Sequence, residues 1–452
     1  MSPALLLLLA LPAQRPLHAN LDQLMPPVEA KLGSGDAQVL VIGDSLSRKG
    51  WTQPFRDNLQ AIWGNGGSGY QGLNWHNAGG FNGGAWDVHN IAEDRAPHSG
   101  IDGLWAQTTV GTPAPGTANS AVLTPWQLGP FDLQYVAQPM GGRFNVLQDT
   151  VSGRKLLATI DTAADDAKVV EWQGVAEGRL VFQPLDEGHP VKILGIVGES
   201  TSPGVRVDRA AVDGWSTVNF VERDETFDAQ VEMLGADLAV IALGANDNTA
   251  ALAPGYRDRL ETIANRLLAA NPNVEVLLMP PYQFGGGSAR LSKMTDDALS
   301  LAQERGFGLI NLYDAAGTTA FFQANGFLGD SIYWNDAGSA YIADLVLEAL
   351  RTKGASLDTP RGDTTGDAKV DLSDFGVLKT YFGQANVTMT QGDLTRDAKV
   401  DLSDFASLKA AFAAAKVAAA VPEPPAAALA ALGLILLCCA RPISLSRSSN
   451  VR

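Results

Sequence analysis

The 452-residue sequence has little cysteine, only five histidines and a deficit of positive charge. Its two cysteines, Cys438 and Cys439, are adjacent inside a terminal apolar run, which excludes a disulfide framework and a zinc site built on cysteine. There are 33 Lys and Arg against 49 Asp and Glu, for a formal net charge of −16. Because a nucleic-acid backbone selects clustered Lys and Arg, this balance argues against nucleic-acid binding. It favours an exported protein that handles neutral substrates or divalent cations.

The two ends of the chain carry targeting signals. Residues 4–13, ALLLLLALPA, form an apolar run too short to span a bilayer, with Ala13 and Ala19 as candidate cleavage points. We therefore predict a signal peptide at residues 1–19. The alternative, a buried N-terminal helix, is disfavoured by the prolines in this segment.

At the C-terminus, the motif Val-Pro-Glu-Pro at 421–424 precedes an apolar run at 426–440 and then Arg441, Arg447 and Arg452. This three-part order at 421–452 resembles the PEP-CTERM sorting signal. The resemblance implies a short transmembrane segment, processing by an exosortase and a cell-surface or extracellular location. The basic tail agrees with a cytoplasmic orientation before processing. A plain membrane anchor is the alternative.

An acidic sequence is repeated with a period of 30 residues, at 362–379 and 392–409. In each copy, oxygen-bearing side chains stand at positions 1, 3, 5, 9 and 12 of a loop, and a backbone carbonyl is available at position 7. Calcium takes six to eight oxygen ligands, and this spacing wraps a 12-residue loop around the ion. The predicted calcium ligands are Asp363, Thr365, Asp367, Lys369, Asp371, Asp374, Asp393, Thr395, Asp397, Lys399, Asp401 and Asp404.

The repeat pair, taken as residues 360–411, resembles a type I dockerin, an EF-hand-like module that binds calcium and docks on a cohesin. It departs from that pattern at position 3, which is Thr, and at position 6, which is Ala368 or Ala398. Position 6 needs a sharp turn that favours glycine, so we expect weaker calcium binding than in the family. The alternative to docking is a calcium-stabilised stalk without a cohesin partner.

The remaining sequence begins with an apolar run at 39–46, VLVIGDSL, which predicts a buried parallel strand that presents Ser45 at its end. A helix is expected over 52–63. The end of such a strand is where α/β folds place reactive groups. The motif Gly-Asp-Ser-Leu resembles the first block of the GDSL or SGNH hydrolases.

Three further blocks follow in the order of that family. The segment 76–83 resembles the second block, which assigns Gly80 as a backbone donor to the oxyanion. Gly-Ala-Asn-Asp at 244–247 resembles the third block and assigns Asn246 as a side-chain donor. The segment 330–338 aligns with the fourth block, in which Asp330 matches the acid and Tyr333 occupies the histidine position.

The pattern between these blocks alternates strand and helix, with strands expected at 238–243, 274–279 and 308–313 and helices at 256–270 and 336–350. We predict a flavodoxin-like, three-layer α/β hydrolase domain at 20–100 and 222–355. Residues 101–221 contain short β-rich runs between Gly, Pro and Asp, which predict an inserted β-sandwich. A small α-helical calcium-loop module follows.

A β-rich insert between the first and third blocks resembles the SGNH enzymes that remove O-acetyl groups from peptidoglycan or other polysaccharides. The resemblance implies an acylated carbohydrate substrate and no catalytic cofactor. In such enzymes the insert resembles a carbohydrate-binding module. The predicted insert of this chain contains the tryptophans Trp105, Trp126, Trp172 and Trp215. Stacking on sugars is one role open to them, and packing in the core is the more common one.

The missing histidine is the main departure from the family. A phenol, with an ordinary pKa near 10, is a poor proton acceptor at neutral pH. Three hypotheses stay open: another histidine acts as the base, Asp330 acts on Ser45 directly or through water, or the domain is a pseudoenzyme that binds acylated glycan without cleaving it. The candidate histidines are His76, His89, His98 and His189. We expect an exported serine esterase, with a non-catalytic surface glycan-binding or scaffold protein as the alternative.

Overall fold

The computed structural model describes residues 15–73, 86–90, 98–108, 120–186 and 188–353, together with short segments further along the chain. Those segments are 364–365, 370, 372–384, 387, 391–392, 394, 399–402, 404–405 and 408–409. The chain divides into two compact units, Met1–Ala355 and Ser356–Arg452. The predicted sorting segment at 421–452 lies outside the described residues. Within the described ranges, no helix is long and apolar enough to cross a membrane.

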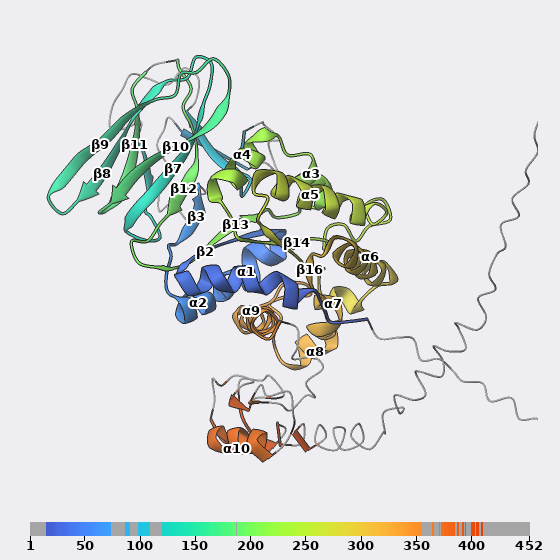
Figure 1. The fold of residues 1–452 in the computed structure, drawn as a ribbon. Coiled ribbons are helices and arrows are strands. Elements are labelled where there is room, and N and C mark those ends of the chain that lie inside the picture. The colour runs from blue at the N-terminus through green and yellow to red at the C-terminus, as the bar shows by residue number, and fades with distance from the viewer. Residues whose placement is uncertain are drawn as a thin grey trace, which may run out of the picture. The chain divides into compact units, whose positions relative to one another are not determined.

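A six-stranded sheet forms the centre of the first unit (Figure 1), in the order β1-β16-β15-β14-β2-β13. β1 pairs antiparallel with β16, and the other neighbours are parallel. The strands are β1 (His18–Ala19), β2 (Asp36–Gly43), β13 (Gly204–Ala211), β14 (Leu238–Ala242), β15 (Glu275–Leu278) and β16 (Gly308–Ile310). Parallel pairing brings the carboxyl ends of β13, β2 and β14 to one edge of the sheet.

Helices cover both faces of this sheet because its strands are apolar on both sides. Val39 and Val41 of β2 pack in one core, and Leu40 and Ile42 in the other, as the two-residue period of a strand requires. The first core contains side chains of α1 (Leu21–Ser34), α2 (Thr52–Trp63) and α9 (Asp336–Arg351). The second contains those of α3 (Thr217–Val221), α4 (Glu225–Leu234), α5 (Tyr256–Ala270) and α6 (Ala289–Arg305). The shorter elements are η1 (Ser47–Trp51), η3 (Phe284–Gly286), α7 (Leu312–Ala315) and α8 (Thr319–Ala324).

The predicted helices over 52–63 and 256–270 match α2 and α5. The predicted strand over 308–313 is shorter, since β16 ends at Ile310. The reason is local: the Asn311 side chain accepts a hydrogen bond from the Asp314 N–H at 3.2 Å and caps the next helix, α7.

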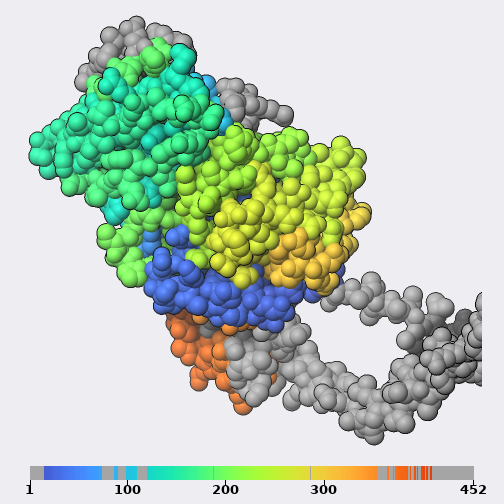
Figure 2. All heavy atoms as spheres, turned by 45° about the horizontal axis from the view of Figure 1, so that its top comes forward, coloured from blue at the N-terminus to red at the C-terminus, as the bar shows by residue number. Residues whose placement is uncertain are grey.

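Two antiparallel sheets make up the β-rich part, in the orders β10-β7-β12-β5-β4, with β3 also on β12, and β6-β11-β8-β9. Their inner faces share one hydrophobic core, in which Tyr135 of one sheet meets Phe144 of the other edge-on at 6.0 Å. In Figure 2 the teal atoms of this part gather in one region of the surface. The strands are β3 (Gly69–Gly72), β4 (Trp86–Asn90), β5 (Leu104–Thr108), β6 (Ala121–Leu123), β7 (Gly129–Ala137), β8 (Arg143–Thr150), β9 (Gly153–Asp161), β10 (Lys168–Ala176), β11 (Arg179–Pro184) and β12 (Lys192–Gly198).

Strand pairing moves the edges of the predicted insert. β13 lies inside the predicted range 101–221 but pairs with β2 in the central sheet. β3 and β4 lie before that range but pair with β12 and β5. The antiparallel part therefore runs from Gly69 to Gly198, because pairing partners, rather than local β-rich composition, decide which sheet a strand joins.

The N-terminal segment from residue 15 is packed against the central body. β1 pairs with β16, and Arg15 forms ion pairs with Asp314 at 2.9 Å and Asp296 at 3.2 Å. The last residues of the predicted signal peptide 1–19 are thus placed inside the first unit.

The second unit contains α10 (Leu372–Tyr381) and a small core made by equivalent positions of the two repeats. Val370 packs in it with Val400, and Leu378 with Leu408. Phe375 and its repeat equivalent Phe405 meet edge-on at 5.9 Å. The internal repeat therefore builds one core from two copies.

Candidate active site

Ser45 stands in a sharp turn between β2 and the helical segment that leads into η1 and α2, and it is only 6% exposed. The carbonyl of Asp44 accepts hydrogen bonds from the Ser47 and Arg48 N–H groups at 3.1 and 3.0 Å. A Cβ on Gly43 would lie 2.3 Å from the Ser47 Oγ, so only glycine fits there. The first block of the motif thus forms a tight strand-to-helix turn that holds the serine at the sheet edge.

The phenol of Tyr333 reaches Ser45. Its hydroxyl donates a hydrogen bond to the Ser45 Oγ at 2.9 Å, although 288 positions separate the two residues. Two residues predicted for the site are therefore in direct contact. A catalytic base must stand within hydrogen-bond distance of the proton that it takes, and the phenol occupies that place.

The loop that carries Tyr333 is held by its neighbours. The Asp330 Oδ1 accepts hydrogen bonds from the N–H groups of Ile332 and Tyr333, both at 2.7 Å, and these bonds hold the pKa of Asp330 below its usual value. The Tyr282 hydroxyl donates to the Ile332 carbonyl, and its ring packs on Trp334 at 4.8 Å. Asp330 is thus an ionised carboxylate that fixes the loop.

Asn246 follows the neighbouring strand, β14, so it lies at the same sheet edge as Ser45. Its Nδ2 donates to the backbone carbonyl of Trp215 at 2.8 Å, and Trp215 follows β13 on the other side of β2. This bond uses one of two amide protons and orients the other. The segments that follow three adjacent strands, β14, β2 and β13, thus lie at one edge of the sheet, and Ser45 follows the middle strand.

Asp247, the last residue of the third block, is fully buried and structural. Its carboxylate accepts from the Thr217 N–H at 3.0 Å and the Thr217 Oγ1 at 2.5 Å, and it forms an ion pair with Arg259 at 3.2 Å. A buried charge needs such partners. The block therefore pairs Asn246, the predicted oxyanion donor, with a residue that anchors its turn.

Asp44, next to Ser45, is fully buried. Burial raises its pKa from 3.8 to about 7, against the opposing effect of hydrogen bonds from the Leu46 and Ala245 N–H groups. The charges of Asp247 and Asp213 raise it further. Sequence reasoning did not single out this carboxyl, and only its burial distinguishes it.

Lys49 is a second residue that the sequence did not indicate. Its Nζ lies 5.2 Å from the centre of the Tyr333 ring and 3.0 Å from the Asp213 Oδ2. Arg48 also contacts Asp213, at 3.5 Å. A positive charge thus lies over the ring whose hydroxyl contacts Ser45.

The candidate histidines are engaged elsewhere or lie outside the described residues. The His98 Nδ1 is 2.7 Å from the Thr226 Oγ1 and 3.5 Å from the Asp224 Oδ2. His189 is exposed, with its Nδ1 3.1 Å from the Met140 carbonyl, and His89 stacks on Trp105 at 5.0 Å. His76 and the predicted oxyanion donor Gly80 lie outside the described residues.

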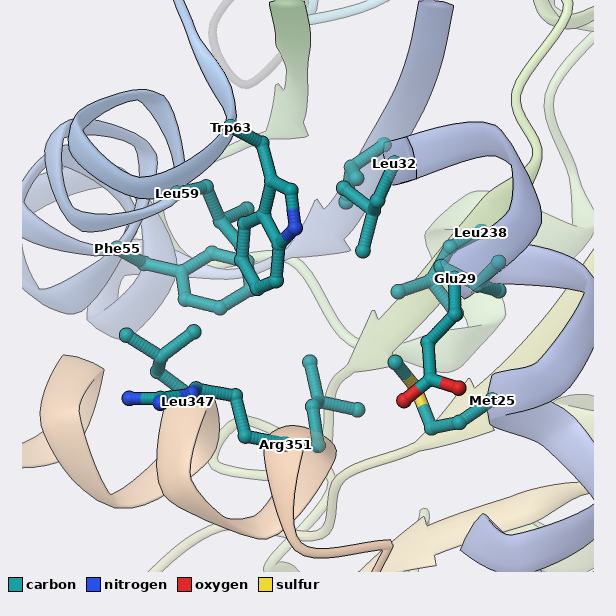
Figure 3. Close-up of a pocket in the computed structure, with 12 residues that line it drawn as sticks. Met25, Glu29, Leu32, Phe55, Leu59, Trp63, Leu238, Leu347 and Arg351 are labelled. Atoms are coloured by element: carbon teal, nitrogen blue, oxygen red, sulfur yellow. The ribbon is translucent and has the colours of Figure 1, made fainter. Parts of the chain in front are cut away.

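A cavity of about 150 Å³ lies away from this site, between α1, α2 and α9 (Figure 3). It is lined mainly by apolar side chains, among them Met25, Phe55 and Leu347. Leu238, which begins β14, also lines it, whereas Asn246 follows the end of that strand. The cavity and the predicted oxyanion donor Asn246 therefore lie toward opposite ends of β14.

The four tryptophans of the predicted insert differ in exposure. Trp105 and Trp215 are buried, Trp172 is partly buried, and Trp126 is 42% exposed. The Arg56 guanidinium lies 6.0 Å from the Trp126 ring. Core packing accounts for the buried pair, and Trp126 is the ring of the four that is most available to a ligand.

The predicted calcium ligands are described only in part. In the first repeat, Asp374 is fully buried, and its Oδ1 accepts from the N–H groups of Thr364 and Thr365 at 2.8 and 3.0 Å. In the second, Asp404 is fully buried, and its Oδ2 accepts from the Asp401 N–H at 2.8 Å. Lys399 is also described, but Asp363, Asp367, Lys369, Asp371, Asp393, Thr395 and Asp397 lie outside the described residues.

Buried carboxylates at position 12 of both loops fit a hard cation, since a buried charge is costly unless it is paired or coordinates a metal. Among the described residues, no group of three or more His, Cys, Asp or Glu comes close enough to hold a metal ion. The donor chemistry of the described part is oxygen only, as calcium prefers.

Comparisons with known proteins agree with these two parts. Residues 196–341 match the GDSL-like lipase/acylhydrolase family, and residues 361–413 match the dockerin type I domain. The first match includes Asn246, Asp330 and Tyr333 but starts beyond Ser45. Comparison with curated proteins finds no match.

Among solved structures, a peptidoglycan O-acetylesterase superposes with a TM-score of 0.58 at 17% identity, covering 74% of this chain and 96% of that chain. A Bacillus subtilis protein covers 63% of this chain and 91% of its own, with a TM-score of 0.31 at 16% identity. A carbohydrate esterase family 3 protein from Talaromyces cellulolyticus covers 32% and 72%, with a TM-score of 0.27 at 18% identity. At these identities the first likeness shows the fold alone.

The first unit thus has the SGNH hydrolase fold with mixed α/β content. The chain contains a GDSL-like lipase/acylhydrolase domain and a dockerin type I domain.

Proposed function

We propose that this protein is an exported serine esterase of the SGNH type that removes acyl groups, acetyl foremost, from a polysaccharide or related glycan. The observation that carries the proposal is the 2.9 Å hydrogen bond between the Tyr333 hydroxyl and the Ser45 Oγ. Asn246 at the adjacent strand end supplies a donor for the oxyanion.

In this mechanism Ser45 attacks the acyl carbon, and the negative charge that develops on the carbonyl oxygen is stabilised by hydrogen-bond donors. Asn246 provides the amide proton that its bond to Trp215 leaves available. The backbone N–H groups of Ser45 and Gly80 complete the predicted set. Preorganised donors of this kind usually supply the largest share of such a rate enhancement.

A neutral glycan suits the surface chemistry of the chain. Its net charge of −16 repels anionic polymers. We propose that the two antiparallel sheets act as a β-sandwich insert that binds sugar, with Trp126 as a stacking platform because it is exposed. Trp126→Ala is expected to raise the KM for acetylated polysaccharide and to leave the KM for a small activated ester unchanged.

A second candidate function is glycan binding without cleavage. The phenol of Tyr333 favours it, because a neutral phenol accepts a proton poorly. Losing the base of a catalytic triad costs on the order of 10⁴-fold in rate.

Hydrolysis of 4-nitrophenyl acetate by the full chain separates the two functions. For an esterase, the wild type is active and Ser45→Ala loses activity on the order of 10³-fold or more. A wild type that is silent, is rescued by Tyr333→His and still binds glycan supports the second function. Activity that survives Ser45→Ala contradicts the serine mechanism.

The dockerin domain and the predicted terminal signals support a proposal about where the protein works. We propose that the second unit binds calcium at its two loops and docks on a cohesin, with a calcium-stabilised stalk as the alternative. Export, exosortase processing and the transient membrane segment rest on residues 1–19 and 421–452. Since Arg15 is ion-paired in the folded body, cleavage after Ala13 preserves that contact, whereas cleavage after Ala19 removes it.

A further inference from the structure

Lys49 connects the Tyr333 ring to a carboxylate on a different element. Its Nζ lies 5.2 Å from the ring centre, and the same atom is 3.0 Å from the Asp213 Oδ2. Asp213 follows β13, whereas Lys49 lies in η1, four residues after Ser45. The serine and the lysine therefore approach Tyr333 from one short segment.

We propose that Lys49 is a positioning residue that stabilises the Tyr333 phenolate, so that this phenolate, in place of a histidine, takes the proton of Ser45. The inference rests on the proposed esterase function. It assigns roles that neither family match assigns: Tyr333 as the base and Lys49 as the charge that makes the base available.

The charges around Tyr333 favour this division of roles. Lys49 and Arg48 are positive, and Asp213 pairs with both, which holds Lys49 in place. Asp330 uses its Oδ1 for two backbone N–H groups and is negative, so it opposes the phenolate and does not replace Lys49. Among the described residues, Tyr282 and Asp44 are two further titratable groups near the site, and burial raises the pKa of both, which favours their neutral forms. Arg209 adds a positive charge next to Arg48, whose carbonyl accepts a hydrogen bond from the Arg209 Nη1 at 2.9 Å.

The acylation step balances without a cofactor. The Ser45 Oγ forms a bond to the acyl carbon while its proton passes to the Tyr333 phenolate, and the carbonyl π electrons move to the oxygen. When the intermediate collapses, the bond to the leaving sugar oxygen breaks, and that oxygen takes the proton from the Tyr333 phenol. Water then repeats both steps on the acyl-enzyme, releasing the carboxylic acid and restoring Ser45.

A phenolate base predicts a pH dependence unlike that of a histidine enzyme. The rate rises with the phenolate fraction, so kcat increases through the alkaline range instead of levelling off near neutral pH. Removing the Lys49 charge disfavours the phenolate. Because the Lys49 side chain is half exposed and solvent screens its charge, the expected upward shift of the kcat midpoint is on the order of half a pH unit.

The experiment measures kcat and KM for 4-nitrophenyl acetate between pH 6 and pH 10.5, roughly spanning the ordinary His and Tyr ranges, with the full-length protein. Ser45→Ala gives the baseline to subtract. The test variants are Lys49→Met, Lys49→Arg and Tyr333→Phe. Arg48→Met is the matched control, since it removes a positive charge that also pairs with Asp213 but is not the one facing the ring. Native tryptophan fluorescence verifies that each variant is folded.

Lys49→Met is expected to have a higher midpoint in its profile of kcat against pH, with unchanged KM. Lys49→Arg and Arg48→Met are expected to have midpoints near that of the wild type, and Tyr333→Phe is expected to lose activity. This inference is wrong if Lys49→Met has the pH profile of the wild type or if Tyr333→Phe is active. In either case the esterase proposal still stands, provided that Ser45→Ala is inactive. A wild type no faster than Ser45→Ala contradicts the esterase proposal itself.

Discussion

Asp330 and Tyr333 are joined through the main chain: the carboxylate accepts the Tyr333 N–H at 2.7 Å, while the phenol hydroxyl of the same tyrosine meets Ser45. In the family motif that this block resembles, the acid orients a histidine ring. Here the acid orients a loop, and through it a phenol.

Replacing Asp330 is therefore expected to displace the loop that carries Tyr333. Asp330→Ala removes both backbone contacts of the loop and lowers kcat on the order of tenfold to a hundredfold, the usual cost of a misplaced catalytic group. Asp330→Asn keeps an oxygen acceptor and loses less. Steady-state kinetics on a small acetyl ester measure both, and a wild-type kcat in Asp330→Ala contradicts the positioning role.

Asn246 is expected to matter mainly in the transition state. Asn246→Ala lowers kcat by about 10²- to 10³-fold with a small change in KM, because the developing oxyanion loses a donor. Asn248→Ala is a matched control two residues further on, where the side chain contacts Ser288 and Arg290. Equal losses in the two variants would show that the turn, and not the amide donor, carries the effect.

Asp44 is expected to make stability depend on pH. Its pKa is about 7 in the folded protein and 3.8 as the reference value, so the folded state binds the proton more tightly. The contribution of Asp44 to the free energy of unfolding is fully present below pH 3.8 and is lost as pH rises through 7, a total change of about 4 kcal/mol. Asp44→Asn has no carboxyl to titrate at this position, so the free energy of unfolding of the wild type, relative to that of the variant, falls between these pH values.

Urea unfolding followed by tryptophan fluorescence measures this difference, because all nine tryptophans lie before residue 355 and report on the first unit. Other titrating groups, such as Asp102 with a pKa raised to about 6 by burial, change the stability of the wild type and of Asp44→Asn by the same amount, so they cancel in the difference. A difference that is constant from pH 4 to pH 8 would contradict the burial effect on Asp44.

The calcium loops are expected to titrate separately. Calorimetric titration of chelator-treated full-length protein with calcium chloride is expected to show one ion per loop, with the first site lost in Asp374→Ala and the second in Asp404→Ala. Calcium is also expected to slow amide exchange in the described segment 372–384, since it would compensate the buried carboxylate of Asp374. The absence of binding heat together with unchanged exchange would mean that the loops bind no calcium.

Several local features followed from the sequence alone. The apolar run at 39–46 predicted β2, and the helical spacing at 256–270 predicted α5, because the side-chain periods of a strand and a helix are local properties. The same apolar run predicted that Ser45 stands at the end of this strand, and the structure shows why glycine at position 43 is needed there. The repeat at 362–409 predicted a duplicated module, and its core is built from equivalent residues of the two copies.

Other features depended on contacts between distant positions. Local β-rich composition placed the insert at 101–221, whereas pairing with β2 assigned β13 to the central sheet. Exposure separated Trp126 from Trp105, although all the insert tryptophans have the same composition signal.

The sequence by itself determined which residues are available for the chemistry: a serine at a strand end, an asparagine after the next strand, and a tyrosine where the family has histidine. Only the tertiary structure decided what that tyrosine contacts, by placing its hydroxyl 2.9 Å from the serine and Lys49 beside its ring. The physical reason is that hydrogen bonding and charge act over a few ångströms in space, whereas these residues come from segments 288 positions apart.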